Sequence, residues 1–379
     1  MRIDEQIRDR LERSLQSVEP PPTQVDPVIR RARSLRRRRR AVGAFIAALG
    51  IVALSVPLVL LSPLGDRNHE PRGVFGTEPG QLIVSARVPL APGITDVVTG
   101  FGGVWVTGNE GVVRVDPTTD QIVAEIRVPG TGDHSTIAVG EGSVWVTAPE
   151  LRPDGSRGNL VRIDPAINNI AATIHLGGPI GGVAVGGGSV WVTLPDSGAS
   201  TVFRIDPTSN RVLSSVPAAE GGGPVVYGEG SVWITNSWAG GSVTEVDPAT
   251  GDVVDTLDVP SVQAVGDGSL WGVTGDSVLR IDPDSGAVQA TIPIARAQDV
   301  VMDGSTVWVL VSPRSSDPTL FYPIAGTAGV VRIDPTTNRV IGESVALDDL
   351  QPIALAEDEG SVWVADYYDG ILSRITAVR

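Results

Sequence analysis

The sequence predicts an all-β fold, a seven-bladed β-propeller, that follows a short helical Arg-rich segment and one transmembrane helix. Three observations support this prediction: a motif that recurs seven times after residue 80, four β-type runs in each repeat, and one long apolar stretch. Repeats of about 40 residues with four strands each are typical of propeller blades. We therefore divide the chain into an Arg-rich cytoplasmic segment, a transmembrane helix, a linker and an extracytoplasmic propeller, at residues 1–40, 41–62, 63–79 and 80–379.

The composition excludes several classes of function. The 379 residues include no cysteine and no lysine, which rules out disulfides, thiolate zinc sites and Schiff-base lysines. The net charge is -15, yet residues 1–40 hold 12 Arg against 6 acidic residues. The other 339 residues hold 17 Arg against 38 acidic residues, a net charge of -21. This asymmetry indicates that the two ends lie in different compartments.

The apolar stretch Ala41–Leu61 has 21 residues without a charge. As a helix it would be about 30 Å long, which matches the hydrocarbon core of a bilayer. Five arginines, Arg36–Arg40, precede it, so we expect the N-terminus in the bacterial cytoplasm and the propeller outside the cytoplasmic membrane. The alternative is a cleaved signal peptide, but the charged leader and the apolar run both exceed the usual lengths. We favour an uncleaved, single-pass signal anchor.

The cytoplasmic segment contains a predicted amphipathic helix. Ile3, Ile7, Leu11, Leu15 and Val18 recur at helical spacing, with arginines and acidic residues between them. We expect this segment to lie on anionic lipid; the alternative is a docking helix for a cytoplasmic partner. We expect no nucleic-acid binding, because the arginine run adjoins the bilayer.

The repeat contains two short motifs that recur along the sequence. The first reads Gly-Ser-Val-Trp-Val-Thr or a close variant, with the tryptophans at Trp105, Trp145, Trp191, Trp233, Trp271, Trp308 and Trp363. The second reads Arg-Ile-Asp-Pro and follows each of the first six tryptophans in some form. Runs of Val, Ile, Thr and Trp with Gly or Asp-Pro between them are strands joined by turns.

The ends of the array predict how the ring closes. The seventh repeat stops after three strands and lacks Asp-Pro, whereas the segment 81–89 precedes the first repeat and resembles an isolated fourth strand. We predict that this N-terminal strand completes the last blade, so that no sheet edge separates the first and last blades.

On these motifs the chain resembles the YVTN/NHL-like propellers, in particular the group related to streptogramin (virginiamycin B) lyase. The resemblance covers 80–379 and implies a magnesium-dependent elimination that opens a cyclic depsipeptide, with two His and a Glu from late blades. No histidine follows His175, so the catalytic His pattern is lacking. The motif also reads Trp-Val-Thr where the lyases have Trp-Phe-Thr-Glu.

Most repeated residues have structural roles in this interpretation. We expect the tryptophans to fill the space between blades, and the arginine two residues before each repeated aspartate to form a ring of ion pairs between blades. Recognition residues should lie where the repeat is broken, in the second-to-third loops and the links between blades, which share one face. We call this the loop face; the regular turns form the opposite, turn face.

The candidate binding residues are aromatic and acidic side chains in these loops, since such residues suit glycan, peptide or protein contact. They are Trp238, Phe321, Tyr322, Asp366, Tyr367, Tyr368 and Asp369. The candidates for the mouth of the central channel are Asp96, His134, Asp299 and Asp348. No catalytic residue and no metal ligand is assigned; calcium or magnesium at these carboxylates is not indicated by any motif.

The predicted function is a non-catalytic module that binds a ligand or an envelope protein on the loop face, as a scaffold or a sensor. The alternative is a lyase or hydrolase of the streptogramin-lyase type with a metal at the channel mouth.

Overall fold

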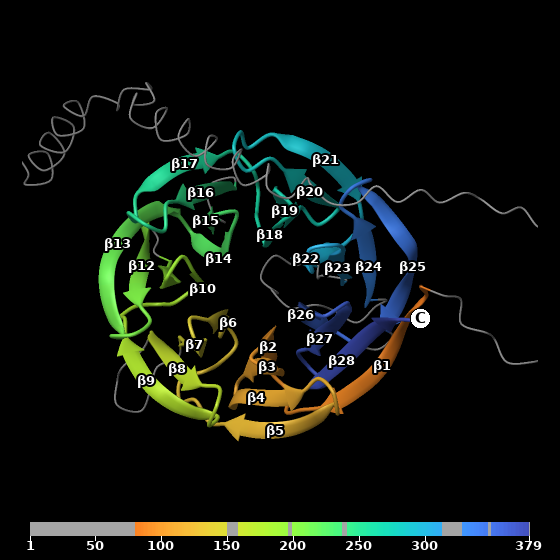
Figure 1. Ribbon diagram of the computed structural model, residues 1–379, viewed down its shortest axis with the longest axis horizontal. Coiled ribbons are helices and arrows are strands. Elements are labelled where there is room, and N and C mark those ends of the chain that lie inside the picture. Colours follow the sequence, from red (N-terminus) through yellow and green to blue (C-terminus); the bar gives the residue numbers. More distant parts are fainter. Residues whose placement is uncertain are drawn as a thin grey trace, which may run out of the picture. The chain divides into compact units, whose positions relative to one another are not determined.

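The computed structural model describes residues 80–149, 158–195, 199–236, 241–312, 328–347 and 350–378. They form seven four-stranded antiparallel sheets arranged in a ring, which confirms the predicted propeller (Figure 1). The predicted cytoplasmic segment, transmembrane helix and linker lie outside these residues. The described part of the chain contains no helix with the length and hydropathy needed to cross a bilayer. Residues 72–379 make up one compact unit.

Each blade runs from an inner strand near the centre of the ring to an outer strand at the rim. The strands of blades 1 to 3 are β2 (Ile94–Gly100), β3 (Gly103–Gly108), β4 (Gly111–Asp116), β5 (Gln121–Ile126); β6 (Ile137–Gly140), β7 (Ser143–Ala148), β8 (Asn159–Asp164), β9 (Asn169–His175); β10 (Val183–Gly186), β11 (Ser189–Leu194), β12 (Ala199–Asp206) and β13 (Arg211–Glu220). Those of blades 4 and 5 are β14 (Gly222–Gly228), β15 (Ser231–Asn236), β16 (Ser242–Val246), β17 (Val253–Leu257); β18 (Ala264–Gly266), β19 (Ser269–Val273), β20 (Ser277–Ile281) and β21 (Val288–Pro293). Those of blades 6 and 7 are β22 (Ala297–Met302), β23 (Val307–Val311), β24 (Ala328–Asp334), β25 (Arg339–Leu347); β26 (Pro352–Asp358), β27 (Ser361–Asp366), β28 (Ile371–Ala377) and, from the other end of the chain, β1 (Leu82–Pro89).

The Asp-Pro turns join the third and fourth strands, as predicted. In blade 1 the Asp116 carboxylate accepts the backbone N–H groups of Thr118 at 2.7 Å and Thr119 at 3.2 Å, which lowers its pKa. The turn closes with a bond from the Asp120 N–H to the Asp116 carbonyl, and Asp120 has a φ of 56°. This left-handed residue explains why the position is occupied by Asn, Asp or Gly in these turns.

The repeated tryptophans lie in the seams between blades. All seven indoles are at most 2% exposed, and each packs against side chains of the next blade. Trp105 of blade 1, for example, shares a hydrophobic cluster with Val144 and Ile163 of blade 2, and Trp363 of blade 7 shares one with Val104 of blade 1. Their predicted core role is confirmed.

The repeated arginines differ from the prediction. Each stacks over the tryptophan of its own blade, with the guanidinium carbon 4.8–5.7 Å from the ring centre. Most then donate to a backbone carbonyl in the Asp-Pro turn of the next blade, as Arg114 does to Pro165 at 2.8 Å. The Arg374 guanidinium also forms an ion pair across a seam, with Asp120 at 3.4 Å. The prediction of a ring of ion pairs is therefore wrong. The arginine side chain is long enough to extend beyond the aspartate of its own blade and to reach the turn of the next blade.

The N-terminal strand closes the ring, as predicted. β1 pairs with β28 from Leu82 opposite Ala377 to Pro89 opposite Ile371. The Gly80 N–H also bonds to the Val378 carbonyl at 2.7 Å, and Arg332 of blade 6 donates to the Gly80 carbonyl. Gly80 thus occupies the place that an Asp-Pro turn holds in the other blades, on the turn face.

Candidate functional site

The candidate site lies on the loop face at the seam between blades 7 and 1. Here residues 90–93 link β1 to β2 and lie between two loops. The Gly93 N–H donates to the Tyr367 carbonyl of blade 7 at 2.6 Å, and the Gly93 carbonyl accepts the Asn109 N–H of blade 1 at 3.1 Å. Gly93 has a φ of 88°, and a side chain there would overlap that of Asn109. The link is therefore held closely between the two blades.

Tyr367 and Tyr368 lie on the blade 7 side of this link. Their rings meet edge to face, with centroids 4.8 Å apart. The Tyr367 hydroxyl donates to Asp133 at 2.8 Å, and Asp133 belongs to the link between blades 1 and 2. Tyr367 therefore ties blade 7 to the far side of blade 1, next to the exposed side chain of His134. Tyr368 is 44% exposed and presents its ring to solvent.

Asp366 and Asp369 shape the loop that carries the two tyrosines. Asp366 is fully buried and accepts the N–H groups of Gln351 and Asp369, the second at 2.7 Å. Burial raises the pKa of Asp366 against the effect of these hydrogen bonds. Asp369 is exposed. Asp366 therefore orders the loop, while Tyr368 and Asp369 face outward.

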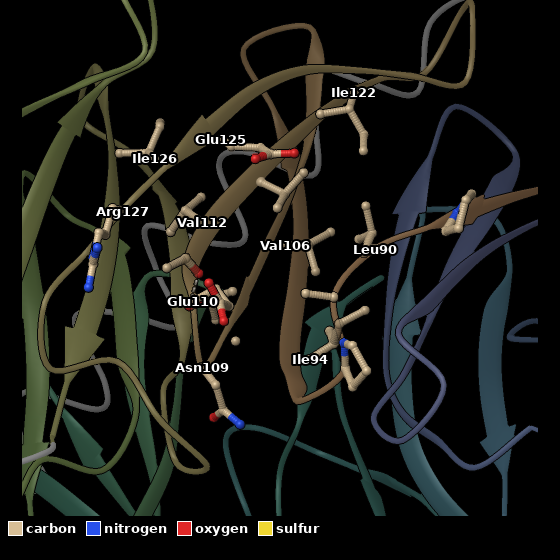
Figure 2. Close-up of a pocket in the computed structure, with 17 residues that line it drawn as sticks. Leu90, Ile94, Val106, Asn109, Glu110, Val112, Ile122, Glu125, Ile126 and Arg127 are labelled. Carbon is tan, nitrogen blue, oxygen red and sulfur yellow. Dashed lines mark hydrogen bonds between the residues drawn. The ribbon is translucent and has the colours of Figure 1, made fainter.

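A cavity of about 380 Å³ opens on the other side of the link (Figure 2). Its hydrophobic lining comes from the link and from the side of blade 1 that faces blade 7: Leu90, Ile94, Val106, Val113 and Ile122. Glu110, Glu125 and Arg127 are polar lining residues. We call this space the seam cavity.

The seam cavity exists because the hairpin between β3 and β4 is short. Only Asn109 and Glu110 separate these strands, the shortest second-to-third connection of the seven blades. This hairpin covers little of the seam, and the outer part of blade 1 remains open there. The sequence analysis missed this cavity. Its signal is Gly108–Gly111, a tight turn where other repeats carry a longer loop.

The inner strands place Asp96 and Asp299 at equivalent positions of blades 1 and 6, each just after a β-bulge. Each carboxylate accepts a backbone N–H from the next blade: Asp96 from Ile137 at 3.0 Å, and Asp299 from Leu355 at 3.2 Å. Burial, with a smaller contribution from the charge of Asp299, raises the pKa of Asp96 to about 7. The two carboxylates therefore influence each other across the intervening blade.

Four predicted site residues, Trp238, Phe321, Tyr322 and Asp348, lie outside the described residues. The structure brings Tyr367, Tyr368, Asp366 and Asp369 together with the link that holds His134, and it places Asp96 and Asp299 on inner strands. Nowhere in the described ranges do three or more His, Asp or Glu side chains form a group able to hold a metal ion.

Comparisons with known proteins establish the fold. No protein-family model matches the sequence, and no curated protein matches it. The structure is similar to virginiamycin B lyase from Staphylococcus aureus, with a TM-score of 0.61, 16% identity, and coverage of 79% of this chain and 100% of the lyase chain. A weaker match is hydrazine synthase from Kuenenia stuttgartiensis, with a TM-score of 0.48, 16% identity, and coverage of 61% and 76%. The similarity to a streptogramin lyase-type propeller confirms the resemblance that the repeated motifs predicted. At this identity it shows a shared fold and not a shared activity.

Proposed function

We propose that this chain is a membrane-anchored binding module that recognises a ligand or an envelope protein, without catalysis, on the loop face at the seam of blades 7 and 1. The observation that carries this proposal is the exposed Tyr368, which is held in place by the Tyr367 hydrogen bond to Asp133 and by the buried Asp366. Rigidly placed aromatic side chains bind with little loss of conformational entropy.

The surroundings of Tyr368 support the same function. Exposed carboxylates at Asp133 and Asp369 and the exposed imidazole of His134 supply hydrogen-bonding groups around the ring. An aromatic platform with polar neighbours suits a sugar ring or a short peptide.

The test is binding of the 72–379 fragment to arrays of bacterial-envelope glycans and peptides. We expect the ligands found with the wild type to lose at least tenfold in affinity with Tyr367→Ala/Tyr368→Ala. The matched control is Phe101→Ala, because Phe101 is an equally exposed aromatic residue on the turn face. Ligands that bind the tyrosine variant and the wild type equally would contradict this recognition surface.

The lyase alternative gives a different result with the same fragment. Magnesium-dependent opening of a cyclic depsipeptide, monitored by mass spectrometry, would overturn the non-catalytic function. Unchanged depsipeptide with and without magnesium is the expected outcome.

A further inference from the structure

The seam cavity has the chemistry of a second binding site. Leu90 and Val113 are half-buried around it, and Ile94 and Val106 form a buried floor. Ile122 stands at the rim and is 40% exposed. A concave surface that combines apolar side chains with polar groups is typical of sites for small molecules, and about 380 Å³ falls in the lower part of their size range.

The polar groups of the seam cavity favour a cation. Glu110 and Glu125 are both exposed, and no hydrogen bond or ion pair engages either carboxylate within the described part of the chain. Glu125 lies opposite Val113 on the neighbouring strand and therefore points to the same side of the sheet as the hydrophobic lining. Figure 2 shows Arg127 on the side away from Leu90, with its guanidinium directed away from the floor.

The charge of the whole propeller acts in the same direction. Residues 80–379 hold 15 Arg and 35 acidic residues, which gives a net charge of -20. Such a charge raises the local concentration of cations and disfavours anions near the surface. A carboxylate beside hydrophobic walls also interacts more strongly with a bound ammonium group than a fully solvated one does.

We propose that the seam cavity binds a small amphipathic organic cation, with its hydrophobic body between Leu90 and Ile122 and its ammonium group at Glu110 and Glu125. This inference rests on the proposed function of the chain as a binding module, and it gives the chemical class of one ligand. The site is separate from the tyrosine surface, since residues 90–93 lie between them.

The experiment compares three probes with the same body and different charges: phenylbutylamine, phenylbutanol and phenylbutyrate. Calorimetry with the 72–379 fragment should show binding of the amine, at least tenfold weaker binding of the alcohol, and weaker binding still of the acid. Added salt should reduce the affinity for the amine. Equal affinity for all three probes, or no binding of the amine, would overturn the proposal.

Two pairs of variants locate the site. Ile122→Trp places a large side chain over the cavity and should abolish amine binding, whereas Val212→Trp, at the equivalent exposed position of blade 3, should not. Glu110→Gln/Glu125→Gln should weaken amine binding at least tenfold, whereas Glu141→Gln/Glu359→Gln, with the same loss of charge on the turn face, should change it less than twofold. Amine binding that survives Ile122→Trp would refute this placement. Tyr367→Ala/Tyr368→Ala should leave amine binding intact, so failure at the tyrosine surface is distinguishable from failure at the seam cavity.

Discussion

Ionisation of the Asp96 side chain affects the stability of the ring. Its carboxylate bonds to the Ile137 N–H of the next blade, and burial raises its pKa from 3.8 to about 7. Between these values the unfolded chain has released the proton while the folded chain still holds it. The free energy of unfolding therefore falls as the pH rises through this interval.

We predict that Asp96→Asn removes this dependence. Wild-type stability should decrease between about pH 4 and pH 7, with a contribution from Asp96 on the order of 1 kcal/mol per pH unit, and the variant should show a flatter profile. Urea unfolding of both proteins across this interval measures the slopes. The Asp96 carboxylate accepts the Val97 N–H on one oxygen, at 2.8 Å, and the Ile137 N–H on the other. An amide has only one oxygen, so the absolute stabilities of the two proteins also differ, and the test compares the slopes alone.

The control is Asp258→Asn, which removes an exposed carboxylate from another blade and should leave the slope unchanged. The turn aspartates do not confuse the comparison: hydrogen bonds lower the pKa of Asp116, Asp206 and Asp334, so their stabilisation is lost only as the pH falls below about 3.8. Parallel profiles for the wild type and Asp96→Asn would contradict the prediction.

Single residues were predictable from the repeat only where their role does not depend on a specific polar partner. The tryptophans recur at one position of every blade, and burial in the seams follows from hydrophobicity alone. The arginine partners were not predictable, because Arg114 reaches a carbonyl 51 residues away, across the seam. The role of Asp366 was also missed, since the fold of its own loop decides whether a carboxylate caps backbone groups or faces solvent.

At the scale of an element, β1 has the largest consequence. It brings the buried side chains of Leu82 and Val88 to blade 7, completes the ladder with β28 and supplies the Gly80 carbonyl to Arg332.

We predict that deleting residues 80–90 severely destabilises the propeller. Loss of β1 exposes the edge of β28 and part of the hydrophobic clusters on both sides of blade 7. Fragments 72–379 and 91–379 should be compared by circular dichroism during heating. The longer fragment should melt cooperatively, and the shorter one should melt far lower or without a sharp transition. A similar melt for both would show that β1 is dispensable.

Most strands and turns could be predicted because each is a local pattern. In blade 2 the Ser-Val-Trp-Val-Thr run of the first motif falls inside β7, and the Arg-Ile-Asp run of the second motif falls inside β8. The seam cavity could not be predicted in this way. It depends on how far a two-residue hairpin reaches over a neighbouring blade, which requires the packing of the seam and not the pattern of one strand.

At the scale of the whole molecule, the number of blades followed from counting motifs, and the closure followed from the incomplete last repeat. The position of the candidate binding surface did not follow from the number of blades or from the closure of the ring, because this surface forms where non-repeated segments meet. Tyr367 and Asp133 are 234 residues apart in sequence and form one contact in the ring. Only the closed circle brings blade 7 next to blade 1.

The proposed topology gives a prediction for the full chain. Because the protein has no cysteine, single cysteines at Ser17 and at the exposed Ala166 report on each side of the membrane without background. In intact cells a membrane-impermeant maleimide should label Ala166→Cys, and it should label Ser17→Cys only after lysis. Labelling of both variants, or recovery of a chain shortened at its N-terminus, would contradict an uncleaved anchor.

The hydrogen bond between Gly80 and Val378 has one more consequence. These two positions adjoin, so a short peptide could splice them into a continuous loop, and the backbone could be reopened at another exposed hairpin. Every sheet would then consist of consecutive strands except the one containing the new break. The positions of the two termini can therefore change without a change of the propeller fold, and so can the point at which a tether joins the propeller.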